Sequence, residues 1–251
     1  MKDLLPITDS PFPMLIAGPC SAETRQQILD TASALRGCGK VIFRAGIWKP
    51  RTRPGGFEGV GSPALQWLRE VKEKFGMMTA TEVGCALHAE KAIEAGIDIL
   101  WIGARTSASP FAVSEIARAL DGVDIPVLVK NPVCVDSQLW VGAVERLYMG
   151  GLRRLGAIHR GFRTGAESVY RNSPMWEIAD EFRSILPDVP MLCDPSHMGG
   201  QRNMIAPICE QARNRGYNGL IVEVHADPDS AWTDSRQQIT PQLFRAICCS
   251  K

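Results

Sequence analysis

The chain has 251 residues, of which 45% are hydrophobic and 22% are charged, so it is long enough to bury a large core. Its 28 Lys and Arg residues against 27 Asp and Glu residues give a formal net charge of +1, without the basic surplus typical of nucleic-acid-binding proteins. No apolar run approaches the roughly 18 residues of a membrane span, and no secretory signal is evident. We therefore expect a cytoplasmic protein, in which most of the eight cysteines are reduced thiols.

Eight short apolar runs are predicted to be buried strands. They show little alternation, as expected of parallel strands covered on both faces. In chain order they span residues 14–17, 41–44, 78–82, 99–102, 127–129, 157–160, 191–193 and 220–223. Helical spacing of apolar residues lies between them, over residues 28–35, 65–71, 88–95, 111–120, 175–185 and 204–215. Helix ends are predicted at Gly37, Gly76, Gly96 and Gly216.

Alternation of this kind through about 250 residues predicts an α/β fold, a closed (β/α)₈ TIM barrel. No linker or change in composition divides the chain, so we expect one catalytic barrel domain over residues 1–251, with 1–13 as an N-terminal extension. An open doubly wound sheet is the main alternative. That fold would be expected to carry a nucleotide-binding loop, and no GxGxxG motif follows a strand here.

Charged or metal-binding residues follow every predicted strand, at the end where barrel enzymes build their sites. They are Cys20, Arg44 with Lys49, Arg51 and Arg53, Glu82, Arg105, Lys130, Arg160, His197 and Glu223. A single Arg after a strand is more often part of a surface salt bridge. At least five cations at one rim would repel each other, so the set predicts an anionic ligand with more than one charged group.

Four of the polar residues could form a divalent metal site. They are Cys20, His197, Glu223 and Asp234. The first, seventh and eighth strands become neighbours only when the barrel closes; without closure, Cys20 would be a core thiol and His197 a loop histidine. Mixed sulfur, nitrogen and oxygen ligands do not choose between Mn, Zn and Fe. His225 is a rival ligand, whereas His88 and His159 are expected to be structural.

The segment 50–61 is long and cationic. Alone, it could equally be a mobile surface connection or a lid whose Arg51 and Thr52 bind a second phosphate group.

Through the residues described above, the sequence resembles the 3-deoxy-7-phosphoheptulonate (DAHP) synthases, in the compact form related to 3-deoxy-octulosonate-8-phosphate synthase. The resemblance runs from Ile16 to Phe244. Its motifs are Ala17-Gly18-Pro19-Cys20-Ser21, Arg44 through Lys49-Pro50-Arg51-Thr52, Ile102-Gly103-Ala104-Arg105, Arg160-Gly161, Asp194-Pro195-Ser196-His197, Val222-Glu223-Val224-His225 and Asp234. It departs from the compact relatives at Asn131-Pro132 and at His159.

The resemblance implies a barrel enzyme that joins phosphoenolpyruvate to erythrose 4-phosphate, the first step of the shikimate pathway. It implies a divalent metal ion held by Cys20, His197, Glu223 and Asp234. Arg105 and Arg160 would hold the phosphate of phosphoenolpyruvate, and Arg44, Lys49 and Lys130 would surround its carboxylate and reacting end. Pro50, Arg51 and Thr52 would bind the sugar phosphate.

For the chemistry, we expect Lys49 to protonate the developing alkoxide, Glu82 to position the attacking water, and Lys130 to act through its charge alone. His197 would serve catalysis as a ligand of the metal ion, which would polarise or orient the aldehyde.

Two other functions remain open. An octulosonate-8-phosphate synthase would use arabinose 5-phosphate, although Lys49-Pro50-Arg51-Thr52 favours the erythrose 4-phosphate enzyme. A catalytically silent barrel could instead be a binding or regulatory partner, although its metal set would then be expected to have lost a ligand. A metal hydrolase barrel is disfavoured because only four histidines are present. The resemblance also implies a homo-oligomer. We do not expect these 251 residues to hold the regulatory domain that some relatives carry, and the chain could be a stand-alone enzyme or a catalytic segment of a longer protein.

Overall fold

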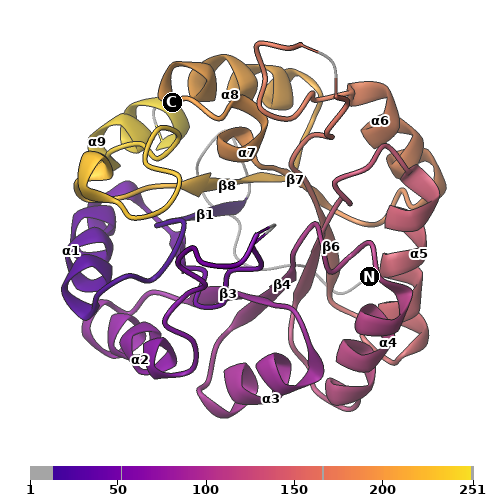
Figure 1. Ribbon diagram of the computed structural model, residues 1–251, viewed down its shortest axis with the longest axis horizontal. Coiled ribbons are helices and arrows are strands. Elements are labelled where there is room, and N and C mark those ends of the chain that lie inside the picture. The colour runs from indigo at the N-terminus through magenta and orange to yellow at the C-terminus, as the bar shows by residue number, and fades with distance from the viewer. Residues whose placement is uncertain (1–13, 52, 166, 250–251) are drawn as a thin grey trace.

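Eight parallel strands close into a barrel in the computed structural model, which describes residues 14–51, 53–165 and 167–249 (Figure 1). The strands are β1 (Met14–Gly18), β2 (Val41–Arg44), β3 (Thr79–Val83), β4 (Ile99–Ile102), β5 (Val127–Lys130), β6 (Leu155–His159), β7 (Met191–Cys193) and β8 (Gly219–Glu223). They follow one another in chain order around the barrel, and β1 pairs with β8 to close it. The predicted fold class is confirmed.

Helices form a ring outside the strands (Figure 1). They are α1 (Arg25–Leu35), α2 (Pro63–Phe75), α3 (Ala86–Glu94), α4 (Pro110–Ala119), α5 (Ser137–Met149), α6 (Trp176–Ile185), α8 (Ile205–Asn214) and α9 (Pro241–Phe244). Shorter turns are α7 (Pro195–Gly199), η1 (Arg36–Cys38), η2 (Arg202–Met204), η3 (Pro228–Ser230) and the π-helical turn η4 (Arg245–Cys249). Within the described residues, no helix is long and apolar enough to cross a membrane.

Helix α5 was not among the predicted elements, although its sequence carries the signals of a helix. The side chain of Asp136 caps it by accepting a hydrogen bond from the backbone N–H of Leu139 at 2.8 Å. Trp140, Val144 and Leu147 are buried at helical spacing. The prediction that Gly37 ends a helix is wrong, because α1 ends at Leu35 and Gly37 lies inside η1.

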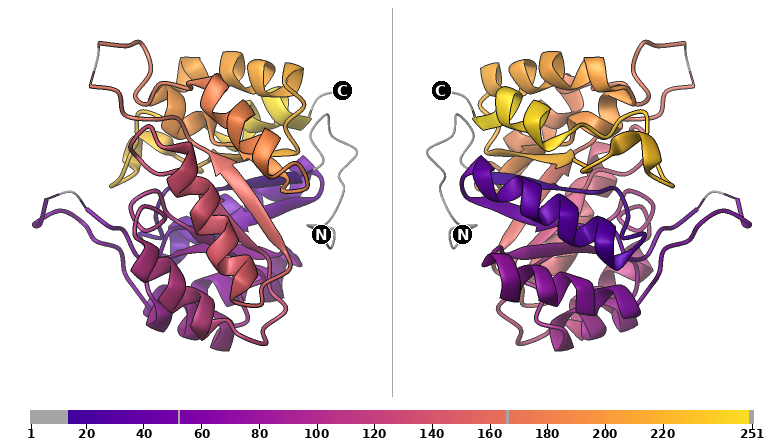
Figure 2. Two further views of the ribbon diagram at one scale, coloured as in Figure 1. Left: turned by 90° about the vertical axis from the view of Figure 1, so that its right-hand side faces the viewer. Right: turned by 90° about the vertical axis from the view of Figure 1, so that its left-hand side faces the viewer.

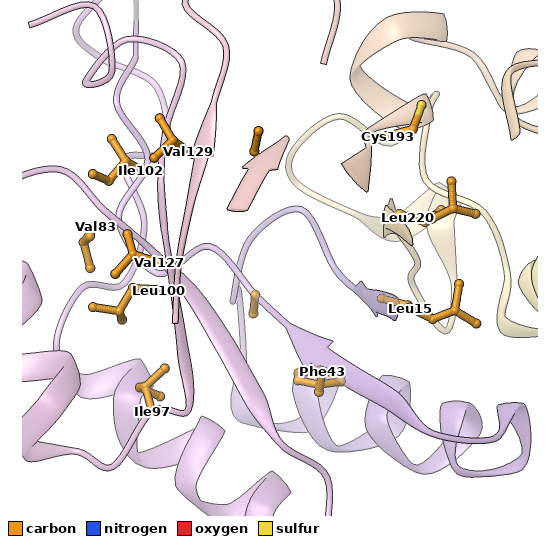
Figure 3. Close-up of a cluster of buried hydrophobic side chains, with 14 of the residues drawn as sticks. Leu15, Phe43, Val83, Ile97, Leu100, Ile102, Val127, Val129, Cys193 and Leu220 are labelled. Atoms are coloured by element: carbon orange, nitrogen blue, oxygen red, sulfur yellow. The ribbon is translucent and has the colours of Figure 1, made fainter. Parts of the chain in front are cut away.

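Successive side chains on each strand point to opposite faces, so the barrel has two apolar layers, one inside it and one outside. The inner layer fills the barrel and consists of Met14, Ile16, Ile42, Ala80, Ile99, Trp101, Leu128, Ile158, Leu192 and Ile221. The alternate residues pack outward against the helices. Figure 3 shows part of this outer layer, with Leu15, Phe43, Leu100, Val127 and Leu220 among its members. Strands buried on both faces explain the short, unalternated apolar runs of the sequence.

The carboxyl ends of the strands all lie at one end of the barrel, as the parallel topology requires. The long loops after β2 and β6 project from the same end of the molecule (Figure 2). The polar residues that follow the strands are therefore brought together at this mouth.

Candidate active site

A cavity of about 340 Å³ opens at the mouth of the barrel. Among the described residues, seven cationic side chains line it, against only two acidic ones. The cations are Lys49, Arg51, Arg105, Lys130, Arg160, Arg163 and Arg171, and the acids are Glu82 and Asp234. In a chain of net charge +1, this local excess of positive charge marks a binding site for anions.

We refer to Arg105, Lys130, Arg160 and Arg163 as the cationic wall; they follow β4, β5 and β6. Arg160 is buried, and its Nη1 donates hydrogen bonds to Asn172 Oδ1 at 2.8 Å and to Gly161 O at 3.2 Å. Burial, together with the positive charges of Arg171 and Arg105, lowers the pKa of Arg160 to about 10. A guanidinium whose charge is disfavoured in this way would gain from a bound anion.

Lys130 lies at the end of β5 and is paired with a buried carboxylate. Its Nζ lies 2.8 Å from Asp194 Oδ2, and His197 Nδ1 lies 2.8 Å from the same oxygen. Burial alone would raise the pKa of Asp194, but His197 and Lys130 outweigh it and hold that pKa well below its usual range. Asp194 also caps α7, since its Oδ1 accepts the backbone N–H of His197 at 3.0 Å.

His197 is oriented by this carboxylate. Burial lowers the pKa of His197 in spite of Asp194, so the neutral imidazole is favoured. Its Nδ1 lies 2.8 Å from Asp194 Oδ2, and its Nε2 lies 3.7 Å from Glu223 Oε1. A carboxylate behind the imidazole is the usual arrangement of a metal-binding histidine.

Cys20, Glu223 and Asp234 converge on one point, and we call these three residues the ligand cluster. One potential ligand atom from each lies within 4.8 Å of those of the other two. Cys20 and Glu223 meet because β1 pairs with β8, with Gly18 opposite Glu223. Asp234 arrives from the loop after β8, and the Cys20 thiol donates to its Oδ2 at 3.3 Å.

The electrostatics of the ligand cluster favour a cation. Burial, followed by the negative charge of Glu223, raises the pKa of the Cys20 thiol to about 12, although Lys49 donates to the sulfur at 3.0 Å. The buried Glu223 Oε1 accepts no hydrogen bond within the described part of the chain. A buried carboxylate oxygen without a donor, beside a thiol and a second carboxylate, fits the donor set of a divalent metal ion.

Arg171 and Gln237 support the two carboxylates from the side of the cavity. Arg171 Nη1 donates to Asp234 Oδ1 at 2.9 Å and to Gln237 Oε1 at 2.5 Å. Gln237 Nε2 then donates to Glu223 Oε2 at 2.6 Å. Burial would raise the pKa of Asp234, but Arg171 and His197 outweigh it, so the carboxylate is held in its ionised form.

Arg44 and Trp101 link the backbone of Cys20 to Glu82. The guanidinium of Arg44 lies 4.9 Å from the centre of the Trp101 ring, and its Nη2 donates to Cys20 O at 3.2 Å. Its Nε and Nη1 are buried and, in the described chain, have no hydrogen-bond partner. Trp101 Nε1 donates to Glu82 Oε2 at 2.8 Å, which fixes that carboxylate at the cavity.

Lys49, Pro50 and Arg51 line the cavity from the loop after β2. Arg51 is held by its own loop, since its Nε donates to Phe57 O at 2.7 Å. Thr52, predicted to share the sugar-phosphate site, lies outside the described residues. This segment therefore reaches the same cavity as the cationic wall.

All described site residues predicted from the sequence lie at this one mouth. His225, the rival ligand, lies apart from the ligand cluster. Its Nδ1 accepts the backbone N–H of Asp227 at 3.0 Å, and the charged groups that act on its pKa are Glu23 and Asp227. His159 faces an aromatic cluster, with Nδ1 2.7 Å from the Tyr217 hydroxyl. His88 stacks on Trp48 with ring centres 4.0 Å apart.

Besides Arg163, four residues of the site were not assigned a role from the sequence, namely Arg171, Asn172, Asp194 and Gln237. Asp194 directly follows β7, so the same rule that selected the other strand ends would have found it. The other three lie in loops far from any strand end, and no local signal marks them. Arg163 lines the cavity, whereas Arg202 pairs with Asp229 at 2.6 Å.

The fold and the site define a (β/α)₈-barrel protein that gathers anion-binding side chains beside a cluster of potential metal ligands. The sequence matches the DAHP synthetase I family over residues 8–251. The chain therefore belongs to that family, and the resemblance drawn from its motifs is confirmed.

Individual relatives agree with this assignment. The chain is 34% identical over 233 residues to phospho-2-dehydro-3-deoxyheptonate aldolase of Thermotoga maritima, covering 93% of this chain and 67% of the relative. A crystal structure of DAHP synthase from the same organism superposes with a TM-score of 0.83 at 32% identity, covering 93% of this chain and 66% of that one. A 2-dehydro-3-deoxyphosphooctonate aldolase of Desulfatibacillum aliphaticivorans is 27% identical, covering 93% and 89%. The chain thus spans about two thirds of the length of the Thermotoga protein.

Proposed function

We propose that this protein condenses phosphoenolpyruvate with erythrose 4-phosphate and water to give 3-deoxy-D-arabino-heptulosonate 7-phosphate and phosphate, as the first step of the shikimate pathway. The observation that carries the proposal is a cavity lined by seven cationic side chains that adjoins the ligand cluster through Asp234. The two substrates bring about five negative charges, at roughly two for each phosphate monoester and one for the carboxylate. Membership of the DAHP synthetase I family supports the same reaction.

The cavity divides naturally between the two substrates. Arg105 and Arg160 would hold the phosphate of phosphoenolpyruvate, because guanidinium groups bind phosphate in a bidentate manner. Lys130 and the unpartnered Nε and Nη1 of Arg44 would face its carboxylate and reacting end. Arg51, with Pro50 and Thr52, would bind the phosphate of the sugar. Binding both anions in one orientation removes much of the entropic cost of their reaction.

The ligand cluster and His197 would hold a divalent metal ion. Support comes from Oε1 of Glu223, which accepts no hydrogen bond from the described residues, from Nε2 of His197 at 3.7 Å from it, and from the ligand atoms of Cys20 and Asp234 within 4.8 Å. When bound, the ion would act as a Lewis acid toward the aldehyde of the sugar. Thiolate, imidazole and carboxylate together suit Mn, Fe or Zn.

The remaining chemistry falls to side chains around the cavity. As C3 of phosphoenolpyruvate attacks the aldehyde carbon, Lys49 would donate a proton to the developing alkoxide. Glu82, fixed by Trp101, would orient the water that adds to C2, after which the C2–O bond to phosphate breaks. Lys130 would act through its positive charge, and its ion pair with Asp194 holds the side chain in position.

The direct experiment measures phosphate release from phosphoenolpyruvate with either erythrose 4-phosphate or arabinose 5-phosphate. We expect turnover with the first sugar, loss of turnover on treatment with a chelator, and recovery on adding Mn²⁺, Fe²⁺ or Zn²⁺. Faster turnover with arabinose 5-phosphate would favour the octulosonate synthase, in line with the octonate aldolase relatives. A protein that turns over neither sugar with any of these ions would be the silent barrel.

Cytoplasmic location and a homo-oligomeric state are further parts of this proposal. The second is tested by light scattering of the purified protein.

A further inference from the structure

Asp234 occupies an unusual position for a member of the ligand cluster. It lies 11 residues beyond Glu223, in a loop rather than at a strand end, and its backbone φ is +50°. A non-glycine residue in the left-handed region is strained and keeps that conformation only where its surroundings hold it. Something in the fold must therefore fix this loop.

Glu23 meets that requirement from the other end of the chain. Its side chain is buried, and its Oε1 accepts the backbone N–H of Trp232 at 2.9 Å and of Thr233 at 3.2 Å. The same oxygen accepts from the hydroxyls of Ser21 at 3.1 Å and Thr233 at 3.4 Å. One carboxylate oxygen thus holds the two residues that precede Asp234. Glu23 is not among the residues that line the cavity.

Gln238 holds the same loop from its other side. Its Nε2 donates to Thr233 O at 2.8 Å, and its Oε1 accepts the backbone N–H of Cys20 at 3.0 Å. Gln238 is fully buried. Its amide therefore ties the backbone of one ligand, Cys20, directly to the residue before the other, Asp234.

We propose that Glu23 and Gln238 form a clamp that sets the distance between the Cys20 thiol and the Asp234 carboxylate, and so determines the affinity of the site for a divalent metal ion. The clamp rests on the proposed metal site. Both are positioning residues: they touch neither the substrates nor the ion, and act through the backbone on which the two ligands are carried. Partners that orient metal ligands in this way typically change metal affinity by about 10–100-fold.

The test is a double-mutant cycle with Co²⁺, whose thiolate charge-transfer absorption reports both affinity and ligation by Cys20. The variants are Glu23→Ala, Asp234→Ala and the double variant, with Asp229→Ala as the matched control. Asp229 is an exposed carboxylate in the same loop, paired only with Arg202 at the surface among the contacts described here.

We expect Glu23→Ala to weaken Co²⁺ binding by about 10–100-fold while keeping the thiolate band. In the Asp234→Ala background the same change should cost no more than about twofold, because the residue through which it acts is gone. Gln238→Ala should weaken binding in the same range, and Asp229→Ala should leave it unchanged. A role confined to folding would instead lower the melting temperature without changing the Co²⁺ affinity.

The outcomes separate the clamp from the metal site. Unchanged affinity in Glu23→Ala, or equal losses with and without Asp234, would overturn the clamp while the site stands. If the wild-type protein shows no thiolate band with Co²⁺, or Asp234→Ala binds it as tightly as wild type, the metal site itself is wrong. Should Glu23→Ala not fold, Glu23→Gln and Gln238→Ala carry the same cycle, with Glu23→Gln expected to lose less because it keeps an acceptor oxygen.

Discussion

The cationic wall lines the cavity and the ligand cluster reaches it through Asp234, and the electrostatics of the two regions differ. In the ligand cluster, negative groups meet: the Cys20 thiol keeps its proton, with its pKa raised to about 12, and Glu223 has an oxygen without a hydrogen-bond donor within the described chain. In the cationic wall, positive groups meet, and burial with neighbouring arginines lowers the pKa of Arg160 to about 10. Each side thus has an excess of one sign of charge, although Lys49 and Arg44 lie beside the ligand cluster and Asp194 pairs with Lys130. In the proposed reaction the ligand cluster would bind a metal ion and the cationic wall would bind an anion, and both ligands would be needed together.

Removing Cys20 should have the largest effect. The change removes a member of the ligand cluster and leaves the cationic wall intact. We expect Cys20→Ala to abolish turnover and to weaken metal binding by more than about 100-fold, taking roughly a quarter of the 10–16 kcal/mol typical of a four-ligand zinc site. Isothermal titration with Zn²⁺ and the phosphate-release assay measure the two effects. Binding of phosphoenolpyruvate to the cationic wall should persist. Turnover at the wild-type rate would contradict a role for Cys20 in binding the metal ion.

Removing Arg160 tests the cationic wall. We expect Arg160→Met to raise the KM for phosphoenolpyruvate by about 100-fold, since truncating one partner of a buried charged pair costs about 2–5 kcal/mol. Metal affinity should change little, because Arg160 belongs to the cationic wall. Arg153→Met is the matched control, as Arg153 is exposed and bonds only backbone oxygens of Tyr148 and Leu152 among the hydrogen bonds described. An unchanged KM would remove Arg160 from the phosphate site.

The sequence predicted the fold because the barrel is built from local signals. Short apolar runs alternate with amphipathic stretches, and parallel strands buried on both faces need no alternation. The missed helix α5 shows the limit of that reasoning: Asp136 and the spacing of Trp140, Val144 and Leu147 were present in the sequence but were not assigned.

Within the site, the predictable residues were those whose position follows from topology. Any residue just beyond a strand must reach the mouth, which places Cys20, Lys130 and Glu223 together without knowledge of side-chain packing. Arg171 could not be found in this way. It contacts Asp234, 63 residues further on, through a loop whose course depends on tertiary packing.

Asn172 links Arg160 of the cationic wall to the backbone of His197, so changing it tests how the two regions are connected. Its Oδ1 accepts from Arg160 Nη1 at 2.8 Å, and its Nδ2 donates to the backbone oxygen of His197 at 2.6 Å. We expect Asn172→Ala to raise the KM for phosphoenolpyruvate by about tenfold, the lower end for a hydrogen bond to a charged group. Steady-state kinetics measure it. In the Arg160→Met background the effect on KM should disappear, and a full tenfold loss there would show that Asn172 acts on another residue.

His159 marks where the cationic wall ends, because it is the last residue of β6, directly before Arg160, but its side chain packs among aromatic rings. Burial lowers its pKa to about 3, so it is neutral in the folded protein. Below about pH 6.5 the unfolded chain binds a proton at this histidine and the folded chain does not, so stability falls as the pH falls. At about 1.4 kcal/mol per pH unit, we expect the free energy of unfolding to decrease by about 2 kcal/mol more in the wild type than in His159→Asn between pH 7 and pH 5. Urea unfolding at the two pH values measures the difference, and the other histidines cancel because both proteins carry them. Equal pH dependence would show that this imidazole is protonated in the folded state, which the uncharged aromatic cluster around it would have to accommodate.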